Sequence, residues 1–251
     1  MPATRGRDQG NGQDGTIDDA AARPLPGRNG RRGSIRPGEA IAHGAVTIPD
    51  IVIRRLPVYV RTLNALAERG VESVSSDELA DHIGVTAAQI RRDLSYFGKF
   101  GKQGKGYDTD FLAGEIGHIL RLDRQWDVAL VGFGNLGRAI AHYRGFVPSF
   151  RIAAIFDHND EQVGERVGGV TVQGEDQIAA VIAREGIRIG IIAVPAPAAQ
   201  GVADRLVAGG VQALLNYAPV VLRVPPTVTV REIDPVGAMQ SMTYYLGDEK
   251  S

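Results

Sequence analysis

Cysteine is absent from this sequence of 251 residues, and the absence excludes several kinds of chemistry. A chain without cysteine has no disulfide, no thiol nucleophile, no thiolate ligand for zinc and no cysteine-based redox switch. The five histidines are scattered and predict no metal site. Long apolar runs are missing too, since none approaches the roughly 20 residues of a membrane-spanning helix, and the N-terminus has no apolar signal segment. We therefore expect a soluble, cytoplasmic protein that binds neither metal nor membrane.

A strong net charge is also absent, because 28 Lys and Arg stand against 29 Asp and Glu, a balance of −1. Taken alone, this balance argues against a nucleic-acid partner, whose phosphates attract clustered Lys and Arg. The charge is unevenly distributed, however. Residues 1–125 have 18 basic and 16 acidic side chains (net +2), and residues 126–251 have 10 and 13 (net −3). Residues 88–106 contain five basic side chains and one acidic side chain, so this short segment has a net charge of +4.

Residues 1–45 contain nine glycines and seven arginines and almost no large apolar side chain. Such a segment cannot bury enough surface to offset the entropy of ordering, so we expect a disordered tail. From residue 46 to 125 the pattern is helical. Apolar residues from Ile53 to Leu66 recur at helical spacing until Gly70. Pro57 either kinks this first helix or marks the first turn of its main part.

Two capping signatures predict the helices that follow. Ser75 and Glu78 have the spacing of a capping box, and Thr86 and Gln89 repeat it. Three helices, of which the last two are joined by only a few residues, predict a helix-turn-helix. Lysine, glycine and aromatic residues then alternate over residues 99–107, as in a short hairpin that we call the wing. A fourth helix is expected over 111–122, before a linker at 123–126.

One face of the third helix is predicted to be basic. Ile90, Leu94 and Phe97 recur at helical spacing and should face the core. The remaining positions carry donors suited to base edges and phosphates, and they are Gln89, Arg91, Arg92, Ser95 and Tyr96. In the wing, cations suited to phosphates or to a minor groove are Lys99, Lys102 and Lys105. Together these features predict binding to double-stranded DNA.

The second half of the chain alternates apolar runs with helical segments. Strands are expected at 127–131, 152–156, 187–194 and 213–216. Helices are expected at 136–142, 176–183 and 198–208. The runs are too continuous for half-exposed strands, which predicts an α/β fold with a doubly wound parallel sheet over residues 126–234, covered on both faces. The last segment, 235–251, should contain a final helix over 236–247.

The first apolar run leads into a glycine-rich turn. Its residues are Gly132, Phe133, Gly134, Asn135, Leu136 and Gly137, and Asp157 ends the next strand, 20 residues beyond Gly137. This context is that of a Rossmann dinucleotide site. Gly132 permits the tight turn, Gly134 lets the backbone approach a pyrophosphate, and Gly137 lets helix and strand pack closely. Asp157 is suited to the adenosine ribose and would repel the extra phosphate of NADP, so NAD(H) is the expected ligand.

Groups for catalysis are scarce near this predicted site. A hydride-transferring enzyme usually needs an acid or base beside the nicotinamide. The second half has no lysine except Lys250, and neither His142 nor His158 lies beyond the strand ends that would hold a substrate. We therefore expect a sensor and not an enzyme. Two alternatives remain open: an NAD-dependent oxidoreductase with an accessory basic domain, and a regulator that binds CoA or NADP.

Four motifs, in their order along the chain, resemble one known family. TAAQIRRDLSYFG at 86–98, GKGY at 104–107, VGFGNLGRAI at 131–140 and NYAP at 216–219 are similar to those of the Rex family of redox-sensing transcriptional repressors. The resemblance covers about residues 49–246. It implies a homodimer of winged-helix and Rossmann domains, here 46–125 and 126–234, whose C-terminal helix is exchanged between subunits. It also implies binding to operator DNA when NADH is low and release when NADH binds.

The resemblance further implies roles for individual residues. Contacts with operator DNA would come from Arg91, Arg92, Ser95 and Tyr96. Contacts with the dinucleotide would come from residues 132–137 and from Asp157, Val194, Pro195, Asn216, Tyr217 and Ala218. A switching relay would consist of Arg61, Tyr143 and Asp234. In this relay a buried Asp234 would pair either with Arg61 or with Tyr143, and the two pairings would define two states of the protein.

Overall fold

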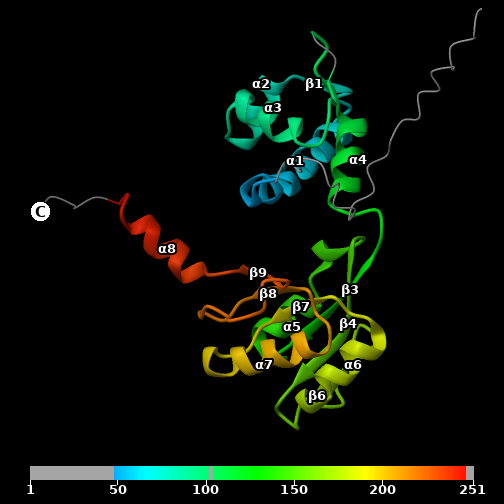
Figure 1. Cartoon of the computed structure of the whole chain (residues 1–251), viewed down its shortest axis with the longest axis vertical. Helices are drawn as coiled ribbons and strands as arrows, with labels where there is room; N and C mark the ends of the chain where they lie inside the picture. Colours follow the sequence, from blue (N-terminus) through cyan, green and yellow to red (C-terminus); the bar gives the residue numbers. More distant parts are fainter. Residues whose placement is uncertain (1–47, 102–103, 247–251) are drawn as a thin grey trace, which may run out of the picture. The chain divides into compact units, whose positions relative to one another are not determined.

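The computed structural model describes residues 48–101 and 104–246. The predicted tail at 1–45, Lys102 of the wing and the last five residues lie outside the described residues. An N-terminal helical domain is followed along the chain by an α/β domain and a final helix (Figure 1).

The N-terminal domain is a winged helix, as predicted. Its helices are α1 (Asp50–Glu68), α2 (Ser76–Ile83), α3 (Ala87–Ser95) and α4 (Thr109–Ile119). Two short antiparallel strands, β1 (Ser73–Val74) and β2 (Tyr107–Asp108), pair the segment before α2 with the C-terminal end of the wing. All four helices contribute to one apolar core, whose fully buried side chains include Leu56, Leu63, Leu79, Ile90, Leu112 and Ile116. Phe97, expected in this core, is half-buried and packs against its edge.

Local hydrogen bonds explain where these helices begin. The predicted capping box of α2 is complete, because Ser75 Oγ accepts from the Glu78 N–H (3.1 Å) and Glu78 accepts from the Ser75 N–H (2.7 Å). α4 begins two residues earlier than predicted because the Asp108 side chain caps it. α1 begins at Asp50, so Pro57 lies inside the helix and not in its first turn.

The α/β domain contains a seven-stranded sheet in the order β5-β6-β4-β3-β7-β8-β9. The strands are β3 (Trp126–Val131), β4 (Phe150–Asp157), β5 (Arg166–Val167), β6 (Val170–Gly174), β7 (Ile189–Ile192), β8 (Ala213–Asn216) and β9 (Thr229–Glu232). All neighbours are parallel except β5 and β6, which form an antiparallel pair at one edge. The helices are α5 (Asn135–Ala141), α6 (Ile178–Glu185) and α7 (Ala196–Ala208), with short 3-10 turns at Arg144–Phe146 and Glu175–Gln177.

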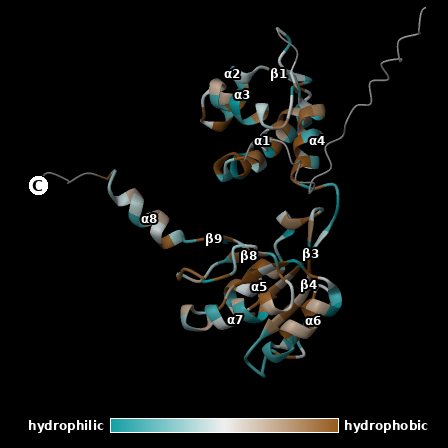
Figure 2. Ribbon diagram, viewed as in Figure 1, coloured by the Kyte–Doolittle hydropathy of each residue, from teal (hydrophilic) through white to brown (hydrophobic). Residues whose placement is uncertain are grey.

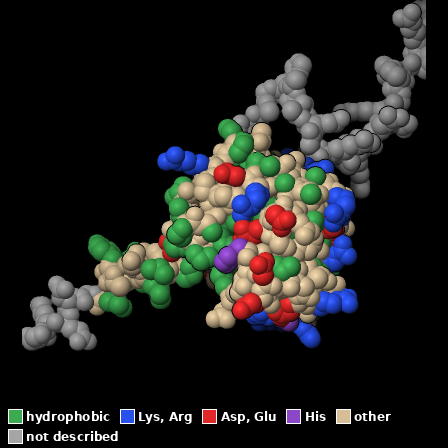
Figure 3. Space-filling model, turned by 90° about the horizontal axis from the view of Figure 1, so that it is seen from below, with side chains coloured by type: hydrophobic (Ala, Val, Ile, Leu, Met, Phe, Trp, Pro, Cys, Tyr) green, Lys and Arg blue, Asp and Glu red, His purple; other side chains and the backbone are tan. Residues whose placement is uncertain are grey.

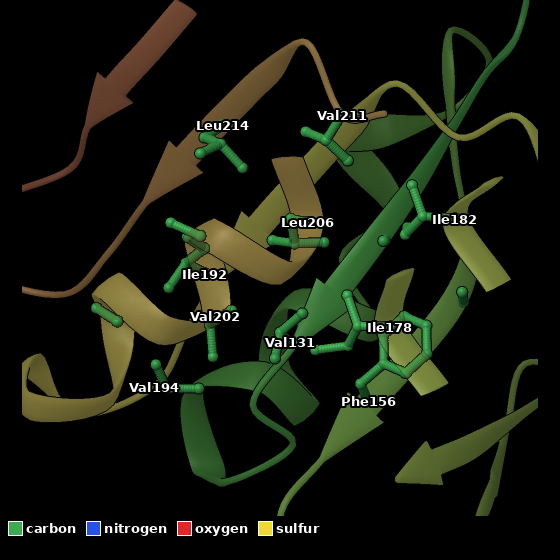
Figure 4. Packing of buried hydrophobic residues seen from close by; sticks show 14 of the residues in the cluster. Val131, Phe156, Ile178, Ile182, Ile192, Val194, Val202, Leu206, Val211 and Leu214 are labelled. Carbon is green, nitrogen blue, oxygen red and sulfur yellow. The ribbon is translucent and has the colours of Figure 1, made fainter. Parts of the chain in front are cut away.

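Helices cover both faces of this sheet, as predicted. Alternate residues of a strand point to opposite faces. On β3, Ala129 and Val131 belong to the cluster formed with α6 and α7, and Figure 4 shows this packing. Val128 and Leu130 belong to the cluster that includes Ile140 of α5. The central strands are accordingly coloured as hydrophobic in Figure 2. The Rossmann-type doubly wound arrangement is therefore confirmed.

The sequence prediction missed the elements at the two edges of the sheet. It found the buried strands β3, β4, β7 and β8 but not β5, β6 or β9. β7 is shorter than the predicted 187–194, and α6 begins at Ile178 after a 3-10 turn and not at residue 176. These differences concern the ends of elements and half-exposed strands, where apolar periodicity is weak.

The final helix, α8 (Pro235–Thr243), contains no buried residue. It begins at Pro235 because the Asp234 side chain accepts from the Gly237 N–H (2.9 Å) and caps its first turn. Its large apolar side chains and those just after it are exposed, and they include Val236, Met239, Met242, Tyr244 and Leu246. Figure 3 shows apolar side chains along this segment, beside the grey C-terminal residues.

Candidate functional sites

The exposed face of α3 carries most of the predicted DNA contacts. Arg91, Arg92 and Ser95 are exposed, whereas Ile90 and Leu94 are buried, as the helical spacing predicted. Tyr96, expected to be exposed, is half-buried. A cleft of about 720 Å³ lies between part of α3 and the wing. Its lining includes Arg91, Ser95, Lys99 and Lys105. Arg91 and Ser95 of the helix thus share one surface with Lys99 and Lys105 of the wing.

Gln89 differs from the prediction. It was expected to be exposed, as one of the donors suited to base edges and phosphates, but it is half-buried and its amide donates to Asp93 Oδ1 (2.7 Å). The Thr86 hydroxyl caps α3 by accepting from the Gln89 N–H (3.1 Å). The capping box is only half formed, because the Gln89 side chain turns toward Asp93, one helical turn later, and not back to Thr86.

Asp93 is the centre of a buried polar cluster that the sequence analysis missed. Its side chain is 0% exposed and also accepts from Arg55 Nε (2.6 Å), Arg55 Nη2 (2.8 Å) and the Tyr59 hydroxyl (2.6 Å) of α1. We call Arg55, Tyr59, Gln89 and Asp93 the Asp93 clamp. The sequence did contain a signal for the burial of Asp93. Asp93 follows Ile90 by three residues and precedes Leu94, so it lies on the apolar side of the helix.

The clamp perturbs the ionisation of its members. Burial opposes the charge of Asp93, but hydrogen bonds from Arg55, Tyr59 and Gln89 together hold its pKa below the ordinary value. The same hydrogen bond with Asp93 raises the pKa of Arg55. Burial, followed by the hydrogen bond to Asp93, raises the pKa of the Tyr59 phenol. The cluster therefore contains a carboxylate, a guanidinium and a neutral phenol at neutral pH.

In the α/β domain, the three fingerprint glycines have different structural reasons. Gly132 has φ +96°, and a Cβ there would lie 2.5 Å from the Ala193 carbonyl oxygen. A Cβ on Gly137 would overlap the Gly132 carbonyl oxygen. Gly134 has φ −71°, and a Cβ there would meet nothing within 4 Å. The packing of the protein itself thus requires glycine at Gly132 and Gly137 but leaves open space in front of Gly134.

The turn lies at the carboxyl edge of four neighbouring parallel strands. Val131 is in register with both Phe156 of β4 and Ile192 of β7, and Ile192 is in register with Asn216 of β8. The segments that follow these strand ends, which carry the predicted dinucleotide contacts, therefore start side by side. Ligands bind at this edge in open α/β sheets.

Asp157 fixes the shape of the turn. Its carboxylate is 4% exposed and accepts hydrogen bonds from the Phe133 N–H (2.5 Å) and the Asn159 N–H (2.8 Å). A carboxylate has lone pairs for about four hydrogen bonds, so these two leave capacity for a further donor such as a ribose hydroxyl.

Phe133 was predicted as a dinucleotide contact, but its side chain is 0% exposed and belongs to the core on the α5 face of the sheet. The Arg138 guanidinium lies 4.4 Å from its ring centroid and pairs with Glu165. Hydrogen bonding to Glu165 raises the pKa of Arg138. The Phe133 side chain is therefore unavailable to a ligand, whereas Asn135 and Leu136 are exposed.

Asn216 is also fully buried, and its amide organises the NYAP loop. Its Nδ2 donates to the carbonyls of Ala218 (3.1 Å) and Val220 (2.8 Å), and its Oδ1 accepts from the Ala218 N–H (3.0 Å). Of the other predicted contacts at these strand ends, Val194 and Ala218 are buried, Tyr217 is half-buried and Pro195 is exposed.

The three predicted relay residues lie in different parts of the chain, namely the helical domain, the α/β domain and the segment before α8. Arg61 is exposed, and Tyr143 is 62% exposed. Asp234, expected to be buried, is exposed and caps α8. The relay stays a prediction.

Two further findings concern the described parts of the chain. No helix within residues 48–101 and 104–246 has the length and apolar character of a membrane span. In the same residues, no group of three or more His, Cys, Asp or Glu side chains could hold a metal ion.

Comparisons with known proteins match both domains. Residues 47–95 match a family described as "Putative DNA-binding protein N-terminus", and residues 123–220 match one described as "CoA binding domain". The chain is 58% identical to the redox-sensing transcriptional repressor Rex of Roseiflexus sp. (strain RS-1), over 79% of this chain and 90% of that protein. It is 46% identical to the protein of the same name from Streptomyces coelicolor, over 79% of this chain and 77% of the other.

This chain is also similar to solved structures of RSP, a Rex-family repressor. The chain is similar to RSP in complex with NAD⁺ and operator DNA, with a TM-score of 0.77 and 40% identity over 81% of this chain and 94% of that chain. It is also similar to RSP in complex with NADH, with a TM-score of 0.73 and 38% identity over 80% and 95% of the two chains.

Proposed function

Because this chain belongs to the Rex family of redox-sensing transcriptional repressors, we propose that it binds operator DNA when NADH is low and releases it when NADH binds. Members of this family are transcription regulators and not enzymes, so the chain is a regulator despite its Rossmann fold. The related RSP has been crystallised with NAD⁺ and operator DNA and with NADH. These are the two effector ligands that we propose for this chain.

One observation carries the ligand assignment: the open space at Gly134. Glycine is needed at Gly132 and Gly137 by neighbouring backbone atoms, but nothing in the protein lies within 4 Å of a Cβ on Gly134. A close approach of a ligand to the backbone explains glycine at such a position. The pyrophosphate of NADH supplies that ligand, and the N-terminus of α5, which no side chain caps, favours its negative charge.

Asp157 supports a preference for NAD(H) over NADP(H). Its buried carboxylate ends β4 beside the turn. A 2′-phosphate placed against this carboxylate would bring two negative charges together in a site shielded from water, which is unfavourable.

For DNA, we propose that Arg91, Arg92 and Ser95 of α3 face the major groove and that Lys99 and Lys105 contact phosphates. Tyr96 and Gln89 are secondary, because both are half-buried and the Gln89 amide is held by Asp93. Arg91 of α3 and Lys99 and Lys105 of the wing border one cleft, which supports a shared DNA surface.

We further propose that the chain acts as a homodimer in which α8 packs against the partner subunit. An exposed apolar face of this kind is typical of a surface that another chain covers. In the dimer, Asp234 would lie close enough to Arg61 or Tyr143 to form the relay. The effector would then shift the balance between the two pairings, and its binding and DNA binding would be coupled reciprocally.

The experiment is a DNA-binding titration at fixed salt, with the operator duplex crystallised with RSP as the probe. We expect binding in the presence of NAD⁺ and release on addition of NADH. CoA and NADPH are tested as competing effectors, and neither should release DNA at concentrations where NADH does. Continued DNA binding in saturating NADH would contradict the proposal, and release by CoA alone would favour the CoA-binding regulator.

A further inference from the structure

The Asp93 clamp connects the helix proposed to read DNA with the first helix of its domain. Asp93 and Gln89 lie one turn apart on α3, and Arg55 and Tyr59 lie one turn apart on α1. All four hydrogen bonds converge on one carboxylate that is 0% exposed. None of the four residues belongs to the relay described above.

Stability alone does not explain a charged cluster at this place. Replacing a buried ion pair with apolar residues of similar volume is often neutral or stabilising. Leu56 of α1 and Ile90 and Leu94 of α3 already belong to one buried apolar cluster. A further apolar pair would therefore hold α1 and α3 together as well as the clamp does.

The clamp differs from apolar packing in its directionality. Burial of apolar surface has no preferred direction, whereas a carboxylate bound by both Nε and Nη2 of Arg55 has a fixed plane and distance. The Tyr59 hydroxyl and the Gln89 amide must be satisfied at the same time. Few rotations of α3 about its axis meet all of these requirements.

The rotation of α3 decides where its exposed side chains point. Successive residues of a helix are separated by about 100° around its axis, because a turn contains about 3.6 residues. Arg91 and Arg92 directly precede Asp93, so fixing Asp93 fixes their directions. Bidentate contacts with base edges depend strictly on such geometry, whereas contacts with phosphates mainly set overall affinity.

We propose that Asp93 is a positioning residue for sequence reading, which aligns the exposed face of α3 through Arg55 and Tyr59 without touching DNA. The inference rests on the proposed DNA binding through α3. It predicts that loss of the clamp lowers the discrimination between operator and other DNA more than it lowers the affinity for DNA in general.

The test uses the full-length chain with the substitutions Arg55→Met, Tyr59→Phe and Asp93→Leu combined, which remove the buried charges and nearly conserve volume. Affinities are measured at several salt concentrations for the operator duplex crystallised with RSP and for a scrambled duplex of equal length and composition. Discrimination should fall by about tenfold or more, the effect of losing one bidentate base contact. The slope of log affinity against log salt should change by less than about one unit, since the phosphate contacts remain.

Two measurements separate positioning from general damage. The thermal midpoint and the NADH affinity of the triple variant should stay close to those of the wild type. Leu63→Met, which conserves volume at a buried α1 position outside the clamp, is the matched control and should leave discrimination unchanged.

Unchanged discrimination in a folded triple variant overturns the inference, and so does an equal loss of affinity for both duplexes. If the triple variant does not fold, Tyr59→Phe decides. It removes one hydrogen bond and keeps the ion pair, so discrimination should fall by up to about fivefold, and no change in it would overturn the inference. If the wild-type chain binds both duplexes equally, the proposed function is refuted. The wild-type measurement alone shows this, so the two failures are distinguishable.

Discussion

Replacing Gly134 with alanine is expected to weaken dinucleotide binding and leave the fold intact. The backbone of Gly134, at φ −71° and ψ −163°, is accessible to any residue, and a Cβ there meets no atom within 4 Å. The space in front of this position is where we place the pyrophosphate. A methyl group there would meet no atom of the free protein, but it would overlap the pyrophosphate in the bound state.

The two expected effects differ in magnitude. Alanine is a poorer N-cap than glycine by ~1 kcal/mol, but it also restricts the unfolded chain, which returns ~0.4–1 kcal/mol. The free energy of unfolding should therefore change by less than ~1 kcal/mol. In the complex, losing one charge-assisted hydrogen bond to a phosphate costs ~1.5–3 kcal/mol, which raises the Kd for NADH by about 10- to 150-fold.

Isothermal titration calorimetry with NADH and thermal denaturation measure these two quantities separately. Gly201→Ala in α7 is the matched control, because its Cβ would meet only Arg205 Nη1, at 3.9 Å, and NADH binding should not change. Gly137→Ala should behave in the opposite way and lose stability together with binding, since its Cβ would overlap the Gly132 carbonyl. An NADH affinity of Gly134→Ala within twofold of the wild type would refute the placement of the pyrophosphate.

Three other predictions concern single charged side chains. Arg92→Ala should weaken operator binding by ~1–3 kcal/mol and binding to a scrambled duplex by less, in a titration at fixed salt, because Arg92 is proposed to face the bases; NADH affinity should be unchanged. Asp157→Asn should lower the ratio of the Kd for NADPH to that for NADH, measured by calorimetry, because the repulsive charge is removed; an unchanged ratio would contradict the role of Asp157. The pKa of Asp93 is held below its ordinary value of 3.8, so its stabilising contribution should be complete above about pH 4 and be lost as the pH falls through the folded-state pKa. Urea unfolding across this acid range should show a steeper loss of stability for the wild type than for Asp93→Asn.

The central part of the fold could be predicted because buried parallel strands are continuously apolar. β3 and β7 are strands of this kind. β9, with the sequence TVRE, lies at the edge of the sheet, pairs only with β8 and is only partly buried. Its mixture of polar and apolar residues is compatible with a loop, so the sequence contained no distinctive signal for it.

The reading face of α3 could be predicted only in part. Helical spacing correctly separated the buried Ile90 and Leu94 from the exposed Arg91 and Arg92. It could not place Gln89, because the position of that side chain depends on Asp93, which in turn depends on Arg55, 38 residues earlier in the chain. A pattern within one helix contains no information about the polar partner that another helix supplies.

Buried polar side chains at both sites have a common physical role, which spacing along the sequence did not reveal. Asp93 and Asn216 are both 0% exposed, and Asp157 is 4% exposed. A polar group can be buried at little cost only when its hydrogen bonds are satisfied. Each of these three meets that condition by binding groups in the segment that would contact a ligand: Gln89 of α3, the Phe133 N–H of the glycine turn, or the backbone of the NYAP loop. Their side chains therefore define the shape of the proposed binding surfaces from beneath.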